Sequence, residues 1–333
     1  MTGKAHCAIL FLKKGRTMSK LTITVLGSGS AFTLNNFQTS FLLTLPSGYN
    51  LLIDCGTDVR MALHELGKSH HDIDGIYISH LHADHVGGME WAAFLTYFDP
   101  SYGKKADLFI HPELRQALWD TLRGGLKTIP KTPVILETFF NVHEVMDNRS
   151  FSVTGKKRDP KFELIRTKHV FNNEVRIPSF GIVCKDPNVL FTTDSQFDPD
   201  GLRGRFEEAE LIFHDCETGP YESGVHAHFN ELRRLPPHIK EKMHLVHFQD
   251  NVVGDLPTRS EMARTIKLAG YCFGHNRTPE EIIEMFTEED EGESILDLIK
   301  ECNDAFNRET EMAKKAKEVG FQGFALPGKT FLV

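Results

Sequence analysis

Short apolar segments recur along the chain, separated by turn residues and by stretches with helical spacing. The first, Leu21–Leu26, is followed by a Gly-Ser-Gly-Ser turn, and Phe41–Leu45 with Asn50–Asp54 predicts a hairpin. Further strands are expected at Ile73–Ser79, Asp107–Ile110, Phe162–Thr167, Phe180–Cys184, Val189–Thr193, Leu211–His214 and Met243–His247. Helices are expected at Val59–Leu66, Val86–Phe98, Pro112–Leu122, Gly201–Ala209 and Asn230–Leu235. Interleaved strands and helices predict a layered α/β architecture.

The pattern changes near both ends of the chain. We expect residues 1–18 to form a tail, because the apolar stretch Cys7–Leu12 is too short for a signal-peptide core. Residues from about 257 to 318 are charged and helix-patterned, whereas Gly320–Val333 returns to a strand-like sequence. The expected organisation is therefore a tail and one domain, residues 19–333, with a helical insertion at about 257–318.

Composition narrows the class of protein. The six cysteines are scattered without a Cys-x-x-Cys pair, which is typical of reduced thiols and favours a cytoplasmic location. Because no apolar run approaches the roughly 20 residues that span a bilayer, no membrane partner is expected. The net charge of −8 argues against binding of long nucleic acid and favours a small anionic substrate.

A dense cluster of metal-ligand residues follows the strand expected at Ile73–Ser79. It contains His80, His82, Asp84 and His85. Imidazole and carboxylate groups are ligands that Zn²⁺ and similar ions prefer. Alternating His80 and His82 point the same way from an extended segment, while Asp84 and His85 turn toward a second point. One loop can therefore serve two neighbouring ions.

Three more candidate ligands each follow or end an apolar strand: His169, Asp194 and His247. Carboxyl ends of strands are where α/β proteins assemble their sites. Taken singly, each residue is more often a capping or surface residue. Their shared position, together with the first cluster, favours metal ligation.

The order His-x-His-x-Asp-His, then His, Asp and His, is similar to the metallo-β-lactamase superfamily. This resemblance implies an αββα sandwich and two divalent metal ions, with Zn²⁺ expected first and Mn²⁺ or Fe²⁺ as alternatives. It implies that one ion is bound by His80, His82 and His169, the other by Asp84, His85 and His247, and that Asp194 bridges them. Zinc β-lactamases generally lack the bridging aspartate, so Asp194 argues against antibiotic hydrolysis.

Two later segments resemble the RNase Z branch of that superfamily. Leu211–Glu217 is similar to its His-Glu-Ala-Thr segment, with Asp215 in place of the glutamate, and His226–Leu232 is similar to the segment with a catalytic histidine. The resemblance implies catalytic roles for Asp84, Asp215 and His226, with His228 contacting substrate. Two alternatives stay open: His214 is structural, and one of His226 and His228 caps the next helix.

The interval between His169 and Asp194 is too short for the tRNA-binding arm of RNase Z enzymes. The spacing instead resembles anti-Pycsar enzymes, which open cyclic nucleotides, and phosphoribosyl cyclic phosphodiesterases. The resemblance implies a homodimeric phosphodiesterase in which a hydroxide held between two metal ions attacks a small phosphodiester, first of all a cyclic nucleotide. An RNase Z-like nuclease and a lactone or thioester hydrolase are the alternatives.

Two aromatic and amide segments are expected near the mouth of the site. They are Phe139-Phe140-Asn141 and Phe171-Asn172-Asn173. Aromatic faces stack on bases, and amides bind base edges, so Phe171 and Asn172 are candidate substrate contacts. The alternative is that these phenylalanines belong to the core.

Overall fold

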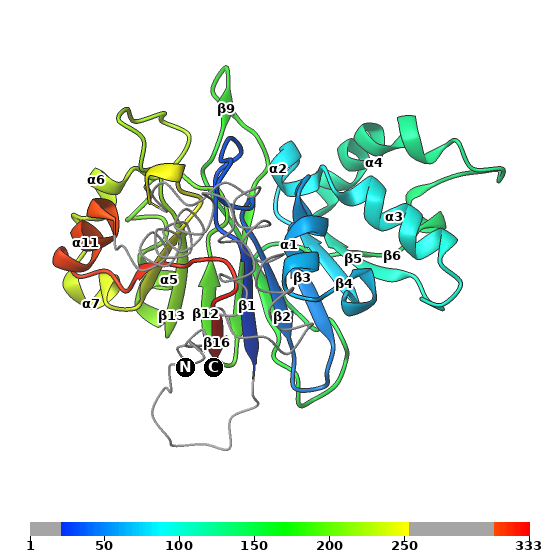
Figure 1. The fold of residues 1–333 in the computed structure, drawn as a ribbon, viewed down its shortest axis with the longest axis horizontal. Helices are drawn as coiled ribbons and strands as arrows, with labels where there is room; N and C mark the ends of the chain where they lie inside the picture. The colour runs from blue at the N-terminus through cyan, green and yellow to red at the C-terminus, as the bar shows by residue number, and fades with distance from the viewer. Residues whose placement is uncertain (1–20, 253–309) are drawn as a thin grey trace, which may run out of the picture.

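The computed structural model describes residues 21–252 and 310–333, in which two seven-stranded sheets face each other (Figure 1). The first sheet contains, in spatial order, β16 (Thr330–Leu332), β1 (Thr22–Gly27), β2 (Ser40–Thr44), β3 (Asn50–Ile53), β4 (Gly75–Ile78), β5 (Ala106–Ile110) and β6 (Phe140–Glu144). The second contains β15 (Gly323–Phe324), β14 (Met243–Val246), β13 (Leu211–Asp215), β12 (Asn188–Phe191), β11 (Phe180–Lys185), β8 (Phe162–Arg166) and β7 (Ser150–Phe151). A separate hairpin pairs β9 (Phe171–Asn172) with β10 (Val175–Arg176).

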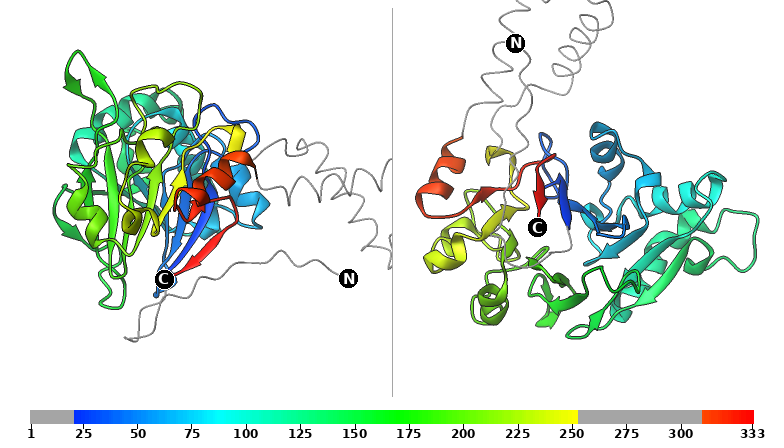
Figure 2. Two further views of the ribbon diagram at one scale, coloured as in Figure 1. Left: turned by 90° about the vertical axis from the view of Figure 1, so that its left-hand side faces the viewer. Right: turned by 90° about the horizontal axis from the view of Figure 1, so that it is seen from below.

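Helices cover the outer face of each sheet, as the two further views also show (Figures 1 and 2). Beside the first sheet lie α1 (Val59–Glu65), α2 (Ala83–Val86), α3 (Met89–Phe98) and α4 (Pro112–Leu126). Beside the second lie α5 (Arg203–Glu208), α6 (Phe229–Leu232), α7 (Pro237–Lys240) and α11 (Glu311–Glu318). Short 3₁₀ turns occupy η1 (His70–Asp72), η2 (Leu136–Thr138) and η3 (Asp250–Val252). The layers are therefore helix, sheet, sheet and helix, which confirms the predicted αββα sandwich.

Strand periodicity sorts the apolar side chains into three layers. In β4, Ile76 and Ile78 pack against the helices, while Tyr77 packs between the sheets. Successive side chains of a strand point to opposite faces, so a strand covered on both faces is apolar throughout. All four residues of β4 are buried accordingly. Between the sheets, the Phe191 and Phe213 rings stack with centroids 5.0 Å apart.

The direction of the central strands determines at which end of the sandwich the candidate ligands lie. Strands β3 to β6 are parallel, and so are β12 to β15. The carboxyl ends of β4, β12 and β14 carry the loops of the candidate ligands His80–His85, Asp194 and His247. His169 follows β8, which runs antiparallel to β11 and therefore in the same direction as β12. The two sheets thus bring loops from distant parts of the sequence to one end of the sandwich.

Several sequence expectations need correction in detail. The single helix expected at Val86–Phe98 is divided at Gly87-Gly88, where a side chain on Gly88 would lie 2.4 Å from the Gly56 carbonyl oxygen. Strands β6, β7, β9 and β10 were not predicted. The expected tail 1–18, and residues 257–309 of the expected insertion, lie outside the described residues. The remainder of that insertion contains α11, and β15 and β16 follow it.

The segment Phe139-Phe140-Asn141 is far from the mouth of the site. Phe139 and Phe140 are buried in the core layer beneath the helices, which confirms the alternative that they are core residues. The Asn141 amide donates to the Lys105 carbonyl and to the Asp107 carboxylate, at the amino end of β5. The expectation that this segment lines the mouth is therefore wrong, because both phenylalanines pack into the core at the start of β6 instead of exposing an aromatic face.

A buried histidine on β14 predicts acid sensitivity. The ring of His244 packs against Phe213 and Phe331, and neither ring nitrogen has a hydrogen-bond partner among the described residues. Burial first, and then the Lys329 ammonium, lower the pKa of His244 from 6.5 to about 3. Between these pH values the unfolded chain binds a proton at His244 and the folded chain does not. The free energy of unfolding therefore decreases as the pH falls from 6.5 toward 3.

We expect His244→Leu to lose less stability in acid than the wild type. At about 1.36 kcal/mol per pH unit, the difference between pH 6.5 and pH 5 should be about 2 kcal/mol. Urea midpoints at the two pH values measure it. His238→Gln, at an exposed histidine paired with Glu207, is the matched control and should behave as the wild type. Equal acid losses in His244→Leu and wild type would contradict the assignment.

Candidate metal centre

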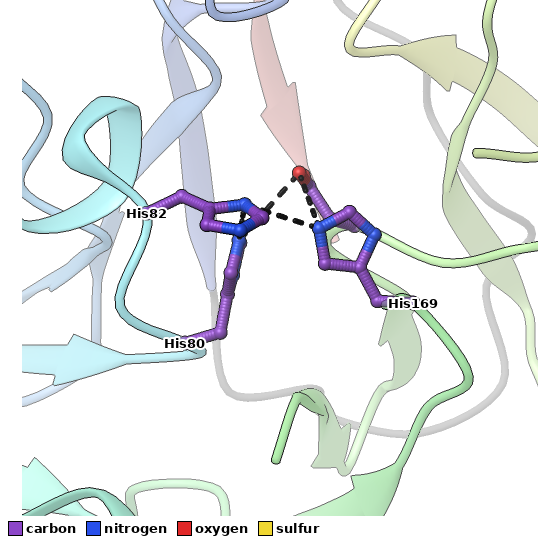
Figure 3. A group of neighbouring side chains, drawn as sticks. His80, His82 and His169 are labelled. Carbon is purple, nitrogen blue, oxygen red and sulfur yellow. Dashed lines mark hydrogen bonds and ion pairs between the residues drawn. The ribbon is translucent and has the colours of Figure 1, made fainter. Parts of the chain in front are cut away.

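Three histidines from two loops converge on one point. Figure 3 shows the rings of His80, His82 and His169 turned toward one another. His80 Nε2 lies 3.0 Å from His82 Nδ1, and His169 Nε2 lies 3.2 Å from the same atom. Nitrogens bound at about 2.0–2.1 Å to one Zn²⁺ have this kind of mutual separation. The three nitrogens and an oxygen of Asp194 lie within 4.8 Å of one another.

A second group forms beside the first and shares Asp194. It comprises Asp84, His85, Asp194 and His247, all buried. Asp84 Oδ2 lies 3.2 Å from His85 Nε2 and 3.3 Å from His247 Nε2. The structure therefore brings together all seven residues that the sequence suggested as ligands, in the two expected groups.

Asp194 spans the two groups through its two oxygens. Oδ1 lies 3.1 Å from His85 Nε2, and Oδ2 lies 3.3 Å from His247 Nε2. Oδ2 also lies 3.7 Å from His80 Nε2 and 3.6 Å from His169 Nε2. The carboxylate is in position to bridge two ions.

Asp54, at the end of β3, supports both groups and was not recognised from the sequence. Its Oδ2 lies 2.7 Å from His85 Nδ1 and accepts a hydrogen bond from the Ser79 hydroxyl, which also contacts His80 Nδ1. Its Oδ1 accepts from the Ser79 amide. Such partners fix the tautomer and orientation of a metal-binding imidazole. In the sequence Asp54 looked only like a strand end.

Left-handed backbone at three strand ends helps to aim these side chains. The φ angles are 59° at Asp54, 52° at Thr193 and 60° at His247. Such conformations cost about 1–3 kcal/mol each in a non-glycine residue and concentrate at functional sites. Because one of them is a candidate ligand and another directly precedes Asp194, the local strain coincides with the candidate centre.

We expect Asp54→Asn to weaken zinc binding about 10–100-fold, the usual effect of losing such an outer partner. The amide keeps the shape of the side chain but lacks the negative charge with which the Asp54 carboxylate accepts the hydrogen bond from His85 Nδ1. Competition with a chromogenic zinc chelator at neutral pH measures the affinity. Asp120→Asn, on the exposed face of α4, is the control. Unchanged affinity in Asp54→Asn would show that the contact does not support the centre.

The buried donor set fits metal ions. His85 Nε2 and Asp194 Oδ1 are buried without a hydrogen-bond partner among the described residues, although they lie 3.1 Å apart. Unpartnered buried polar atoms are costly, and a shared cation satisfies both. The five imidazoles and two carboxylates of this set are also ligands that Zn²⁺ or Mn²⁺ accepts.

The charges of the site depend on one another. Burial alone would raise the pKa of Asp194, but His247 and His85 hold it well below its usual range. Burial would lower the pKa of His85, yet the carboxylates of Asp194, Asp54 and Asp84 hold it well above its usual value. For His80, burial and the neighbouring His85 keep the pKa well below that of a free imidazole.

His226 lies beside the metal groups and is held by Asp215. Its Nδ1 is 2.7 Å from Asp215 Oδ2, and its ring stacks against His247 with centroids 4.6 Å apart. The amide of Ser195 donates to the same Asp215 oxygen. Burial lowers the pKa of His226, but the Asp215 carboxylate outweighs it and raises the pKa to about 9. Asp215 therefore favours the protonated form of the imidazole.

The other expected substrate residues are placed differently. His228 caps α6: its Nδ1 accepts from the Asn230 amide, and its Nε2 donates to the Gly219 carbonyl. The capping alternative therefore describes its contacts, and a role in substrate binding stays a prediction. Phe171 and Asn172 are exposed on the β9–β10 hairpin, which projects at the top of Figure 1. His214 points away from the site, against Phe206.

The αββα sandwich is shared with known metallo-β-lactamase-fold proteins. A Bacillus subtilis protein of that fold, YhfI, superposes with a TM-score of 0.55 at 17% identity, over 95% of this chain and all of its own. Human tRNase Z, short form, gives a TM-score of 0.52 at 20% identity, over 68% of this chain and 93% of its own. The class of the protein is therefore the metallo-β-lactamase fold.

Sequence comparison resolves the family within that class. The family model described as anti-Pycsar protein Apyc1 matches residues 21–267. The Apyc1 protein of Bacillus phage vB_BsuM-Goe3 is 35% identical over 69% of this chain and 90% of its own. That of Paenibacillus harenae is 38% identical over the same shares. The chain belongs to the anti-Pycsar protein Apyc1 family, and it is a metal-dependent phosphodiesterase.

Proposed function

We propose that this protein hydrolyses cyclic nucleotides with two divalent metal ions. The observation that carries the proposal is the pair of ligand groups joined by Asp194, with His226 beside them. One ion would be held by His80, His82 and His169, the other by Asp84, His85 and His247. Two ions at such a centre lower the pKa of a water molecule and neutralise charge that develops on phosphate oxygens.

The chain's own residues supply the proton for the leaving group. Because His226 Nδ1 faces Asp215, its Nε2 remains to hold a proton for the departing oxygen. Asp215 fixes the tautomer and favours the charged imidazole. It also lies near the ligand His247, with Oδ1 3.6 Å from His247 Nδ1. We propose Asp84 as a ligand that is also essential for the chemical step.

A small cyclic substrate is favoured over a long one. Anti-Pycsar enzymes open cyclic nucleotides, and the short interval between His169 and Asp194 contains only β9 to β12 rather than a tRNA-binding arm. The Phe171 ring, 43% exposed, has the Arg176 guanidinium over it and offers a face for stacking a base. Asn172, next to it, is the proposed contact to the base edge.

Three further points belong to the proposal. We propose Zn²⁺ as the native ion, since imidazoles outnumber carboxylates among the ligands, with Mn²⁺ and Fe²⁺ as alternatives. A homodimer is proposed, and sedimentation measures it. We also propose a cytoplasmic location. No helix in residues 21–252 and 310–333 has the length and apolar character of a membrane span.

Turnover of a substrate panel by the metal-loaded protein tests the proposed function. The panel contains purine and pyrimidine 3′,5′-cyclic nucleotides, bis-p-nitrophenyl phosphate, a tRNA precursor, a lactone and a thioester. We expect cyclic-nucleotide turnover that is lost in Asp84→Ala and reduced in His226→Ala. Turnover of the tRNA precursor alone would favour an RNase Z-like nuclease, and turnover of the lactone or thioester alone would replace the proposal by the other hydrolase class.

A further inference from the structure

A second cluster of metal-ligand side chains lies outside the centre described above. His70 and His71 belong to η1, and Asp99 caps the carboxyl end of α3. His70 Nε2 lies 2.7 Å from Asp99 Oδ2, and His71 Nε2 lies 3.0 Å from the same oxygen. The Nε2 atoms of two consecutive histidines thus point at the same carboxylate oxygen.

These separations match those within the main centre. There, His80 Nε2 and His82 Nδ1 are 3.0 Å apart, and Asp84 Oδ2 and His85 Nε2 are 3.2 Å apart. Ligand atoms about 3 Å apart surround a common point at the bond lengths of first-row divalent ions, about 2.0–2.2 Å. We propose that His70, His71 and Asp99 form a further site for a divalent transition-metal ion such as Zn²⁺.

The local structure holds these ligands in place. The Ser69 hydroxyl accepts from the His71 amide, and Asp72 accepts from the Ser69 amide, so a capping box fixes the turn. The Ser101 amide and hydroxyl both donate to Asp99 Oδ1, which leaves Oδ2 for the histidines. Ser101 first, and then His70, keep the pKa of Asp99 well below its usual range. The carboxylate is therefore a charged, oriented ligand.

The cluster is open to ions from solvent. The His71 side chain is 45% exposed, Asp99 23% and His70 15%. The His70 and His71 rings have centroids 4.3 Å apart, so both imidazoles lie within reach of one ion. A metal ion shared by two imidazoles and a carboxylate has coordination positions left for water. Imidazole and carboxylate select Zn²⁺, Ni²⁺ or Cu²⁺ over Ca²⁺ or Mg²⁺.

An ion there would connect two elements that lead to the main centre. β4 begins after η1 and ends just before His80, while α3 begins after the His80–His85 loop and ends at Asp99. The strand and the helix therefore run from the same loop to the two sides of the surface cluster. Binding should hold the start of β4 and the end of α3 together, about one strand and one three-turn helix away from that loop.

Zinc content by equilibrium dialysis and mass spectrometry tests the proposal. We expect His71→Ala to bind one Zn²⁺ per chain fewer than the wild type. His143 is a surface histidine 3.2 Å from Asp107, and no metal-ligand group of the described residues includes it. His143→Ala should therefore bind as many ions as the wild type. Because the result is a difference between chains with the same main centre, it does not depend on how many ions that centre holds or on its substrate.

Thermal unfolding gives an independent readout. A ligand that binds only the folded chain raises its stability. With the main centre saturated, further Zn²⁺ should raise the Tm of the wild type and of His143→Ala, but not that of His71→Ala. Phosphodiester turnover should stay unchanged in His71→Ala. Equal zinc content and equal Tm shifts in the wild type and His71→Ala would overturn the proposal.

Discussion

Replacing Asp194 by alanine should lower kcat/KM for phosphodiesters at least about a thousandfold, which corresponds to about 4 kcal/mol of transition-state stabilisation. Asp194 contributes an oxygen to both candidate ligand groups, so its loss affects both ions at once. It also removes the carboxylate that faces His85 and His247 in the buried centre. The variant should retain at most one tightly bound zinc ion in this centre, as measured by mass spectrometry.

Asp198→Ala is the matched control for this prediction. Asp198 lies on the same loop after β12, but its carboxylate pairs with Lys168 at 2.9 Å instead of facing the histidines. Its zinc content and turnover should match the wild type. Asp194→Asn separates charge from shape, because the amide keeps one oxygen donor. Turnover within tenfold of the wild type in Asp194→Ala would contradict the bridging role.

His226→Ala should lower kcat about 10²–10⁴-fold on cyclic nucleotides, the usual contribution of a positioned proton donor. The alkoxide that leaves a cyclic nucleotide is a strong base and needs a proton. p-Nitrophenolate is a much weaker base, so hydrolysis of bis-p-nitrophenyl phosphate should fall far less. Zinc content should remain that of the wild type, because His226 is held by Asp215 and is not one of the seven proposed ligands.

Asp215→Asn tests the pairing of Asp215 with His226 by changing the carboxylate instead of the imidazole. Asp215 acts through His226, so the loss should show the same dependence on leaving group but be smaller. His228→Asn keeps a capping side chain at the start of α6 and separates the two roles of His228. A raised KM for cyclic nucleotides would favour substrate contact, and unchanged kinetics would favour capping.

For His226→Ala, equal losses of turnover on cyclic nucleotides and on bis-p-nitrophenyl phosphate would contradict proton donation.

The sequence predicted the metal groups well because each ligand is tied to a local signal. His80 to His85 form one compact motif, and His169, Asp194 and His247 each follow or end an apolar strand. Strand ends are readable from hydrophobic runs, and parallel strands bring such ends together. The resemblance to the metallo-β-lactamase superfamily then sorted the residues into two groups, the same groups that the structure forms.

What escaped prediction depends on contacts between distant segments. Asp54 supports His85 and Ser79 across adjacent parallel strands, and no spacing in the sequence marks that contact. Strand β6 alternates between apolar and polar residues from Phe140 to His143, but the aromatic and amide side chains at its start favoured a substrate contact over a strand. The His70–Asp99 cluster joins a 3₁₀ turn to the end of a helix, which required the packing of α3 to be known.

The most direct test of the account is a metal titration of activity. The metal-free protein receives increasing Zn²⁺, and hydrolysis of a 3′,5′-cyclic nucleotide is followed in the wild type and in His71→Ala, in which the main centre is intact. The account predicts that turnover appears with metal and reaches its plateau when two ions per chain occupy the main centre. Full turnover with a single ion in His71→Ala, or none at any zinc content, would contradict it.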